Sequence, residues 1–342
     1  MSMIDADAHV HETQRTWEYM VGADREYRPQ VVQLPDDKGV ALDWWVIDGR
    51  LQPKQQNIGE DTDLLTREGL DIPGRLRHMD QLGVDVQVIY PTIFLRPLTN
   101  RPAVDRALCR AYNRWLADIW AEGQGRLRWA AVLPLLDMDA ALAELRWARE
   151  HGACAAFIRG LETRGRLVDP YYFPLYELAM ELDVPIGIHS GTAAFQTYDF
   201  FGDDEPGFNK FKLAVVGAFH SLIFHDVPAR FPTLRWGFIE VSAQWIPYVL
   251  HDLAKRFKRR GQELPRDVLR RNRIYVACQT DDDLAYVLGY SGADTIVIGS
   301  DYGHADTSSE LEALRLLKEH GDIDPAVIDR ILDDNPRALY AL

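Results

Sequence analysis

Cysteine is scarce in this sequence, and its positions form no motif. Cys109, Cys154 and Cys278 are the three cysteines in 342 residues, and no two of them have the C-x-x-C spacing of a metal or redox site. A sparse, odd set argues against a disulfide framework and is typical of a reducing compartment. The opening stretch MSMIDADAHV contains neither the basic segment nor the apolar segment of a signal peptide. We therefore expect no signal peptide and a cytoplasmic location.

Long apolar runs and basic stripes are also lacking. No apolar run approaches the length that spans a bilayer, so we expect no membrane partner. The formal net charge is −14, with acidic and basic residues mixed along the chain and no basic stripe, which makes nucleic acid an unexpected partner. No G-x-G-x-x-G follows the first apolar run, so the dinucleotide-binding fold has no support.

Eight short apolar runs alternate with amphipathic segments. Several runs are almost continuously apolar, as strands buried on both faces are, and segments such as 137–152 have apolar residues at helical spacing. This alternation predicts an α/β fold with a parallel sheet, closed as a (β/α)8 TIM barrel; a doubly wound open sheet is the alternative. The runs are residues 3–10, 84–90, 127–133, 153–159, 184–189, 234–240, 273–279 and 294–301.

Two segments are longer than a bare barrel needs. Residues 12–74 form a long insertion after the first strand, and residues 190–208 form a lid loop after the fifth. Both follow strands, so both belong to the face where barrel enzymes carry their active sites. We predict a single domain over residues 1–342, with 12–74 covering the active site. The insertion contains Trp17, Trp44 and Trp45, which form either an apolar wall for substrate or a small core beneath the loop.

Potential metal ligands stand where the predicted strands end. Alternate residues of a strand face the same side, so the first run directs a row of carboxylates and imidazoles into the barrel. Burying so many ionisable groups without a partner is costly, and a cation would offset that cost. These residues predict a metal centre, and their His and carboxylate types suit zinc, manganese or iron. They are Asp5, Asp7, His9 and His11 in the first run, His189 in the fifth, Glu240 in the sixth, Asp301 in the eighth, and His304 just beyond it.

The ordered set of motifs resembles the amidohydrolase superfamily, and within it the amidohydrolase-2 group that includes aminocarboxymuconate-semialdehyde decarboxylase. The resemblance covers nearly the whole chain. It implies a metal held by two residues of the first strand, by His189 and by Asp301, and it also implies a homodimer. The motifs are IDADAHVHE, GVDVQVIYPT, AYNRWLADI, PIGIHSG, RFPTLRWGFIEVSAQWIPYVL, GSDYGHAD and DNPRALYAL.

The first-strand pair has two registers. The pair is Asp7 and His9 in one register and His9 and His11 in the other; we prefer the first because Ile4-Asp5 then aligns with the start of the family motif. The sequence departs from the related decarboxylases at the sixth strand, where they have a His and this chain has Glu240. Glu240 and His304 add to the ligand set, and this surplus raises the prospect of a dinuclear centre.

These residues support more than one function. We expect a metal-dependent enzyme that hydrolyses or decarboxylates a small carboxylated, aromatic or cyclic substrate, with zinc or manganese as cofactor. The alternative is a di-iron oxygenase that hydroxylates an apolar carboxylate or thioester, and a non-catalytic barrel is the least expected. The predicted catalytic residues are Glu240, Asp301 and His304, and the predicted substrate contacts are Arg159, Tyr90 and Trp45.

Overall fold

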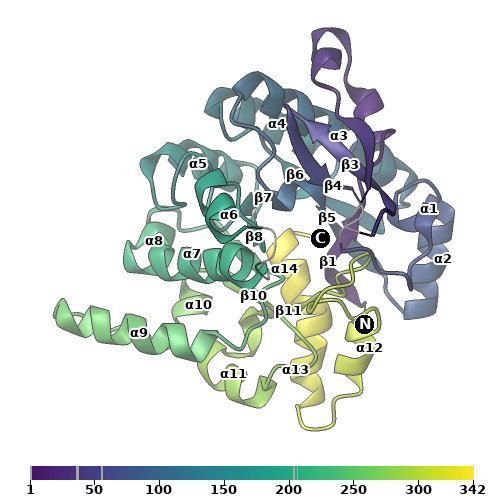
Figure 1. Cartoon of the computed structure of the whole chain (residues 1–342). Helices are drawn as coiled ribbons and strands as arrows, with labels where there is room; N and C mark the ends of the chain where they lie inside the picture. The colour runs from purple at the N-terminus through teal and green to yellow at the C-terminus, as the bar shows by residue number, and fades with distance from the viewer. Residues whose placement is uncertain (1, 36–37, 55–56, 203–204, 206) are drawn as a thin grey trace.

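The computed structural model describes residues 2–35, 38–54, 57–202, 205 and 207–342, and its centre is an eight-stranded parallel sheet. The strands neighbour one another in chain order and curl into a nearly closed barrel surrounded by helices (Figure 1), which confirms the predicted TIM barrel. All eight predicted runs contain a strand. The strands are β1 (Ile4–Val10), β5 (Val86–Pro91), β6 (Leu127–Val132), β7 (Ala153–Arg159), β8 (Ile186–His189), β9 (Trp236–Ile239), β10 (Ile274–Cys278) and β11 (Ile296–Ile298).

The barrel closes between its first strand and the segment that follows its last. The Asp301 amide donates to the Asp7 carbonyl at 2.9 Å, and the His9 amide donates to the Tyr302 carbonyl at 2.9 Å. These bonds place Asp7 and His9 directly beside Asp301, although almost 300 residues separate them along the chain.

Helices cover the outside of the barrel. Asp137 caps one of them by accepting from the Ala140 amide at 3.2 Å, and this helix fills the predicted segment 137–152.

Pro336 lies in the first turn of the last helix, where the missing amide costs no hydrogen bond. Among the described residues, no helix has the length and apolarity needed to cross a bilayer. The helices are α1 (Leu64–Arg67), α2 (Ile72–Leu82), α3 (Pro102–Glu122), α4 (Met138–Glu150), α5 (Phe173–Glu181), α6 (Phe195–Phe201), α7 (Leu213–Phe224), α8 (Val227–Arg230), α9 (Ile246–Arg259), α10 (Val268–Arg271), α11 (Leu284–Ser291), α12 (Ala313–Lys318), α13 (Pro325–Asp329) and α14 (Asn335–Tyr340).

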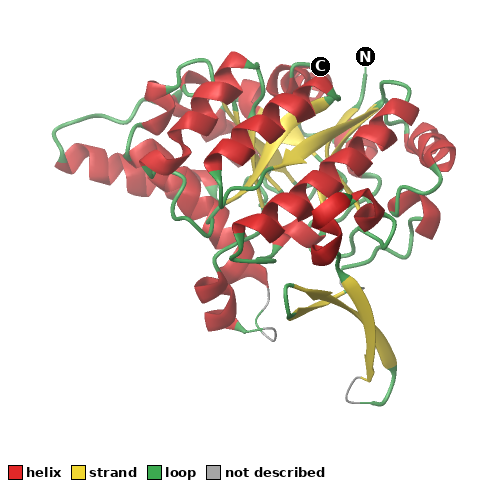
Figure 2. Cartoon of the chain, turned by 90° about the horizontal axis from the view of Figure 1, so that it is seen from above, coloured by secondary structure: helices red, strands yellow, loops and turns green. Residues whose placement is uncertain are grey.

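The insertion after β1 contains a separate antiparallel sheet of β2 (Gln30–Pro35), β3 (Ala41–Ile47) and β4 (Arg50–Pro53). Figure 2 shows this small sheet standing away from the barrel. Asp48 and Gly49 join β3 to β4 with φ values of 49° and 76°, which are typical of a type I′ hairpin turn. Residues 36–37 and 55–56 of the predicted insertion lie outside the described part.

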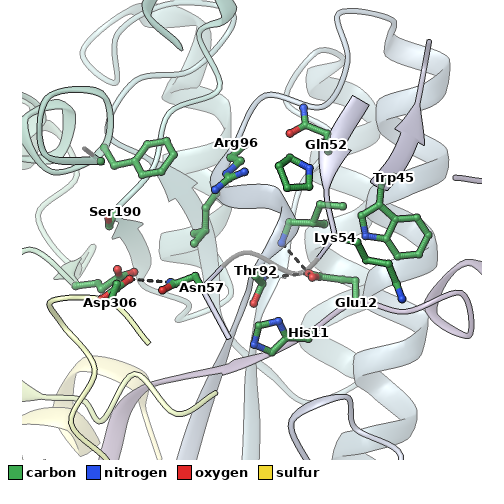
Figure 3. A pocket seen from close by; sticks show the side chains of 16 residues that line it. His11, Glu12, Trp45, Gln52, Lys54, Asn57, Thr92, Arg96, Ser190 and Asp306 are labelled. Carbon is green, nitrogen blue, oxygen red and sulfur yellow. Dashed lines mark hydrogen bonds between the residues drawn. The ribbon is translucent and has the colours of Figure 1, made fainter. Parts of the chain in front are cut away.

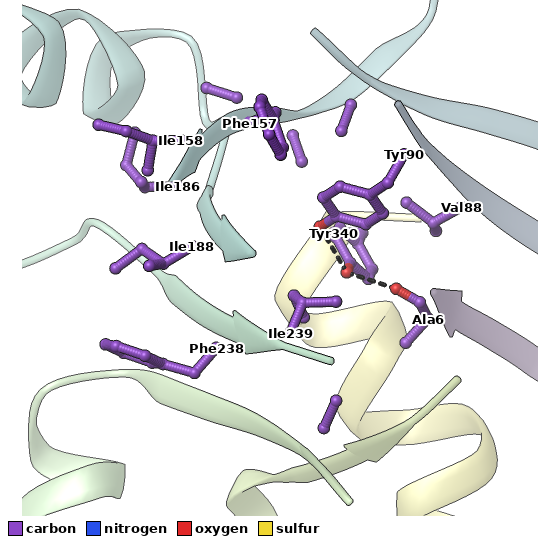
Figure 4. Close-up of a cluster of buried hydrophobic side chains, with 14 of the residues drawn as sticks. Ala6, Val88, Tyr90, Phe157, Ile158, Ile186, Ile188, Phe238, Ile239 and Tyr340 are labelled. Atoms are coloured by element: carbon purple, nitrogen blue, oxygen red, sulfur yellow. Dashed lines mark hydrogen bonds between the residues drawn. The ribbon is translucent and has the colours of Figure 1, made fainter. Parts of the chain in front are cut away.

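Aromatic side chains fill the barrel beneath the strand ends. Tyr340 of α14 enters the barrel and donates to the Ala6 carbonyl at 2.8 Å, and its hydroxyl lies 2.9 Å from that of Tyr90 (Figure 4). Each buried hydroxyl therefore has a polar partner, as burial requires. The three cysteines are free and buried.

Candidate metal centre

Six ionisable side chains from four strand ends meet at one place. Asp7 and His9 come from β1, His189 ends β8, Glu240 follows β9, and Asp301 and His304 follow β11. The carboxyl ends of parallel barrel strands share one rim, so residues far apart in the chain converge there. All six are buried and divide into two overlapping groups, in each of which the ligand atoms lie within 4.8 Å of one another. The groups are Asp7, His9, His189 and Glu240, and His9, Glu240, Asp301 and His304.

His9 lies at the centre of both groups. Its Nε2 atom is 3.4 Å from Asp7 Oδ1 and 3.3 Å from Asp301 Oδ1. The two ring nitrogens of His189 contact two different carboxylates. Nε2 lies 3.2 Å from Asp7 Oδ1, and Nδ1 lies 3.2 Å from Glu240 Oε2. These distances are those expected of side chains that surround a single small ion.

Four buried atoms of this cluster lack a well-aligned hydrogen bond within the described part of the chain, although two of them, His304 Nδ1 and Asp301 Oδ1, lie 2.7 Å apart as an ion pair. They are His9 Nε2, Glu240 Oε2, Asp301 Oδ1 and His304 Nδ1, which belong to the four residues of the second group. Burying so many ionisable groups with so few aligned hydrogen bonds is costly. A divalent cation among them would satisfy all four, so these residues fit a metal ion.

Neighbouring groups hold the ligands in orientation. His9 Nδ1 lies 3.1 Å from the Pro91 carbonyl, which leaves Nε2 to face the cluster. Thr92 Oγ1 lies 2.9 Å from His304 Nε2, and Ser309 donates to Asp301 Oδ2 at 2.6 Å. The two histidine rings stack with centroids 3.8 Å apart.

Two of the ligands occupy left-handed backbone. Glu240 has φ 61° and Asp301 has φ 54°, a region that non-glycine residues seldom adopt. Such a conformation costs about 1–3 kcal/mol and persists only where the surrounding structure requires it. At both strand ends, this left-handed backbone conformation directs a carboxylate side chain into the cluster.

Burial controls the charge of the cluster. It raises the pKa of the Asp301 carboxyl to about 6 and lowers the pKa of His9 to about 3, to which repulsion from His304 adds. Burial, followed by the charge of Asp301, raises the pKa of Glu240 well above its ordinary value. Burial also favours the protonated form of Asp7, but His189 and His9 outweigh it and lower the pKa of that carboxyl. A bound cation would offset much of this cost of burying charge.

A cavity of about 220 Å³ opens beside the cluster (Figure 3). Glu240 belongs both to the ligand groups and to the cavity wall. Trp45 of β3 forms part of the wall, as the sequence predicts, and Gly207 reaches it from the predicted lid 190–208. Residues 203–204 and 206 of that lid lie outside the described part. Trp45 also packs edge-on against Trp17 at 6.1 Å, so the insertion provides both a cavity wall and a small core.

Arg159 does not line this cavity, where the sequence places it as a substrate contact. Its guanidinium is buried and bonded twice to Glu162, from Nε at 2.7 Å and from Nη2 at 2.6 Å. A third bond runs to the Phe94 carbonyl at 2.7 Å. The chain turns back after β7 and brings Glu162 onto the arginine, which holds the guanidinium away from the cavity.

Tyr90 does not line the cavity, and His11 is not among the grouped metal ligands. Tyr90 is directed into the barrel core, where its hydroxyl bonds to Tyr340, and it does not line the cavity. His11 lines the cavity but belongs to neither ligand group, because β1 ends at Val10 and the His11 ring turns to the Gly303 carbonyl at 2.7 Å. This placement agrees with the Asp7–His9 register.

Two cations and one carboxylate of the cavity wall were not predicted from the sequence. Arg96 comes from the loop after β5, Lys54 follows β4, and Asp306 follows β11. Lys54 is paired with Asp43 at 3.4 Å. No ion pair involves Arg96 within the described residues, and Figure 3 shows its side chain directed toward the cavity. A basic residue in a strand-end loop was the signal that could have indicated Arg96.

Comparison with known proteins places the chain in a family. Residues 4–342 match the model of the Amidohydro_2 family, described as amidohydrolase, so the chain belongs to that family and the resemblance seen in the sequence is confirmed. It is 30% identical over 136 residues to a gamma-resorcylate decarboxylase of Polaromonas sp. (strain JS666 / ATCC BAA-500). That match covers 35% of this chain and 39% of the relative.

Solved structures share the fold. An amidohydrolase from Mycobacterium avium subsp. paratuberculosis K-10 superposes with a TM-score of 0.79 at 22% identity, covering 99% of both chains. A 5-carboxyvanillate decarboxylase from Novosphingobium aromaticivorans DSM 12444, complexed with manganese and 4-hydroxy-3-methoxy-5-nitrobenzoic acid, gives 0.71 at 18% identity, covering 100% of this chain and 96% of that one. The family confirms the expected enzyme of hydrolase or carboxy-lyase type.

Proposed function

We propose that this protein is a metal-dependent carboxy-lyase that removes CO2 from a small aromatic or cyclic carboxylic acid. One observation carries the proposal: Glu240 belongs both to the buried ligand cluster and to the wall of the cavity beside it. A proton-carrying group and a metal centre therefore share one small, largely enclosed space. The decarboxylase named above as a partial relative supports the reaction class.

His9, Asp301 and His304 of the second group would hold the metal, which when bound would act as a Lewis acid on a substrate oxygen, and Glu240 would stay free to carry the proton. Trp45 offers a flat apolar wall for the substrate ring. The Arg96 guanidinium takes the role first predicted for Arg159 and pairs with the substrate carboxylate. As the carbon–carboxylate bond breaks, its electron pair stays on the ring carbon, which takes a proton from Glu240, and CO2 leaves.

The number of potential metal ligands supports a second candidate function. Six side chains in two overlapping groups exceed what one zinc or manganese ion needs, and Glu240 and His9 belong to both groups. This overlap favours a two-metal centre bridged by Glu240, which in its two-iron form is the oxygenase alternative. The relatives described above include no oxygenase, so the carboxy-lyase is the better-supported proposal.

Metal analysis together with a product assay tests the proposal. The purified protein is analysed for metal per chain and by visible absorption, then incubated with hydroxybenzoic acids while CO2 release is measured. About one zinc or manganese per chain, no visible band and CO2 equal to substrate consumed would support it. Two irons per chain with an oxygen-dependent band would establish the oxygenase instead. Hydrolysis of carboxylated amides or lactones without CO2 would establish a hydrolase.

Two variants test the roles of the residues. We expect Glu240→Gln to lower kcat by roughly 10²–10⁴-fold, the range of general acid–base catalysis, while at least one metal per chain remains. We expect Arg96→Met to raise KM with a much smaller effect on kcat, because it removes binding of the carboxylate. Full activity of either variant contradicts the role proposed for that residue. Asp301→Asn serves as the control that loses the metal.

A further inference from the structure

The cavity beside the metal cluster is lined by charges of both signs. A ligand that enters such a cavity displaces water, so a charged side chain of the wall then needs a partner either in the protein or in the ligand. The bonds that each charged side chain already makes therefore separate charges that serve the fold from charges that are available to a ligand. Apart from histidine, the acidic and basic side chains of the wall are Glu12, Lys54, Arg96, Glu240 and Asp306.

Three of these five side chains are already engaged by the protein. Lys54 Nζ lies 3.4 Å from Asp43 Oδ2. Glu12 accepts one backbone amide on each carboxylate oxygen, at 3.1 and 3.0 Å, and so anchors the loop that follows β5. Glu240 belongs to both groups of metal ligands. The charges of these three side chains therefore have a role without any substrate.

Arg96 and Asp306 remain. Neither side chain forms an ion pair with a residue that the structure describes, and no ion pair joins the two. Figure 3 shows both of them at the cavity, with Asn57 beside Asp306. Opposite charges in one wall that served only the fold would be expected to pair with each other. An unpaired cation and an unpaired anion are instead complementary to a ligand that carries both charges.

Asp306 is oriented by neutral donors and keeps free acceptor capacity. It accepts from Asn57 Nδ2 at 2.8 Å and from the Ser308 amide at 2.7 Å, whereas a carboxylate can accept about four hydrogen bonds. Lys212 does not neutralise it, because Lys212 Nζ bonds to the Thr307 and Ser308 hydroxyls at 3.2 and 3.0 Å. Asp306 is exposed at the rim of the cavity, where an incoming ligand would cover it.

We propose that the cavity selects a zwitterion, a small carboxylic acid that also carries an ammonium group. Arg96 binds the carboxylate and Asp306 binds the ammonium group, which offers three hydrogen-bond donors. This inference rests on the proposed function and adds a second charge to the substrate class named there. A bound zwitterion leaves no unpaired charge in the wall, whereas a simple carboxylic acid would leave Asp306 without a counter-charge.

Ligands of nearly equal size test this proposal. Aminomethyl-, hydroxymethyl- and ethylbenzoate differ only in the group that would face Asp306, and the amine is protonated at pH 7 as that of lysine is. The ortho, meta and para isomers offer different separations of the two charges. Dissociation constants are measured by isothermal titration calorimetry with the metal-loaded protein. For at least one ring position, we expect the aminomethyl compound to bind roughly tenfold more tightly than both of its isosteres.

Two variants assign the two charges of the ligand. Asp306→Asn should abolish the preference for the aminomethyl compound and leave binding of the ethyl compound unchanged. Arg96→Met should weaken all three benzoates but not benzylamine, which has no carboxylate. The control, Asp139→Asn, makes the same charge change at an exposed position of α4 and should keep the full preference. Metal content and Tm show that each variant is folded.

Two binding results would overturn the proposal. One is an aminomethyl compound that binds no more tightly than its hydroxymethyl isostere at any ring position. The other is a preference that survives in Asp306→Asn, which would place the ammonium group elsewhere. CO2 release is measured in the same samples, so binding and reaction are judged separately. A zwitterion that binds as expected but releases no CO2 contradicts only the proposed reaction, whereas decarboxylation of hydroxybenzoates without any preference for zwitterions contradicts only this inference.

Discussion

At the scale of single residues, the alternation of a strand and the positions of strand ends decided most of the candidate site. Asp7, His9, His189, Glu240 and Asp301 stand at strand ends in the sequence and meet in the structure. Their positions follow from local rules, because a strand's last residues always reach the same rim of a barrel. The directions of Arg159 and Tyr90 do not follow from local rules. Arg159 turns to Glu162, three residues on, and to the distant Phe94 carbonyl, and Tyr90 turns to the distant Tyr340 hydroxyl.

Arg159 and Glu162 give a prediction about stability. Replacing Arg159 by Met leaves the Glu162 carboxylate buried without its partner, and breaking a buried ion pair in this way costs about 3–5 kcal/mol. We therefore expect a lower free energy of unfolding, measured by urea denaturation, and unchanged metal stoichiometry.

The matched control for Arg159 is the double variant Arg159→Met with Glu162→Gln. Neutralising Glu162 removes the unpaired charge, so at least half of the lost stability should return. A double variant as unstable as the single one would show that the guanidinium contributes mainly by packing.

At the scale of secondary structure elements, the predicted strands and helices formed because apolar periodicity specifies them directly. The small sheet β2–β4 was expected only as a long loop, although the Asp48-Gly49 dipeptide between apolar strands is a hairpin signal. Buried and less buried side chains also alternate at the end of β3, next to this turn, where Trp45 and Ile47 are buried. The hairpin was not predicted because the high content of Pro and polar residues in 12–74 is typical of a loop.

Trp45 connects this sheet to the cavity and to the core. It is 2% exposed, so Trp45→Ala should cost about 3–5 kcal/mol of stability and raise KM, because it removes both the packing against Trp17 and the cavity wall. The measurements are urea denaturation and steady-state kinetics with the substrate found in the screen. Trp45→Phe, which keeps an aromatic wall, should retain most of both properties. Equal loss in the two variants would contradict this account.

At the scale of the whole molecule, buried ionisable groups make stability depend on pH. Burial raises the pKa of Asp105 on α3 from 3.8 to about 6. The folded state therefore binds more protons than the unfolded state between these values, so this group lowers stability as pH rises from about 4 to about 6. Asp105→Asn should remove that loss, which is roughly 2–3 kcal/mol at neutral pH.

Urea denaturation at pH 4.5 and pH 7 checks this prediction. The variant should gain stability over the wild type at pH 7 and little at pH 4.5. Asp139→Asn, at an exposed position of α4, is the control and should change neither value. A gain of equal size at both pH values would mean that charge at Asp105 is not the cause.

The metal centre affects the stability of the whole barrel as well. A ligand that binds only the folded state stabilises it, by about 2.7 kcal/mol at one hundred times its Kd. Treatment with a chelator should therefore lower Tm, and added zinc or manganese should restore it. Asp301→Asn should show a low Tm that neither treatment changes. A wild-type Tm that is insensitive to the chelator would contradict a metal held by these buried residues.

The sequence by itself determined the barrel, the order of its strands and the residues at their ends, because hydrophobic periodicity and strand alternation are local properties that few arrangements satisfy. Only the tertiary structure decided that Arg96 and not Arg159 faces the cavity and that His11 lies outside the ligand groups. These outcomes depend on which groups meet across the fold. A buried charge or hydroxyl turns toward whichever partner satisfies it, and that partner is fixed only when the chain has folded.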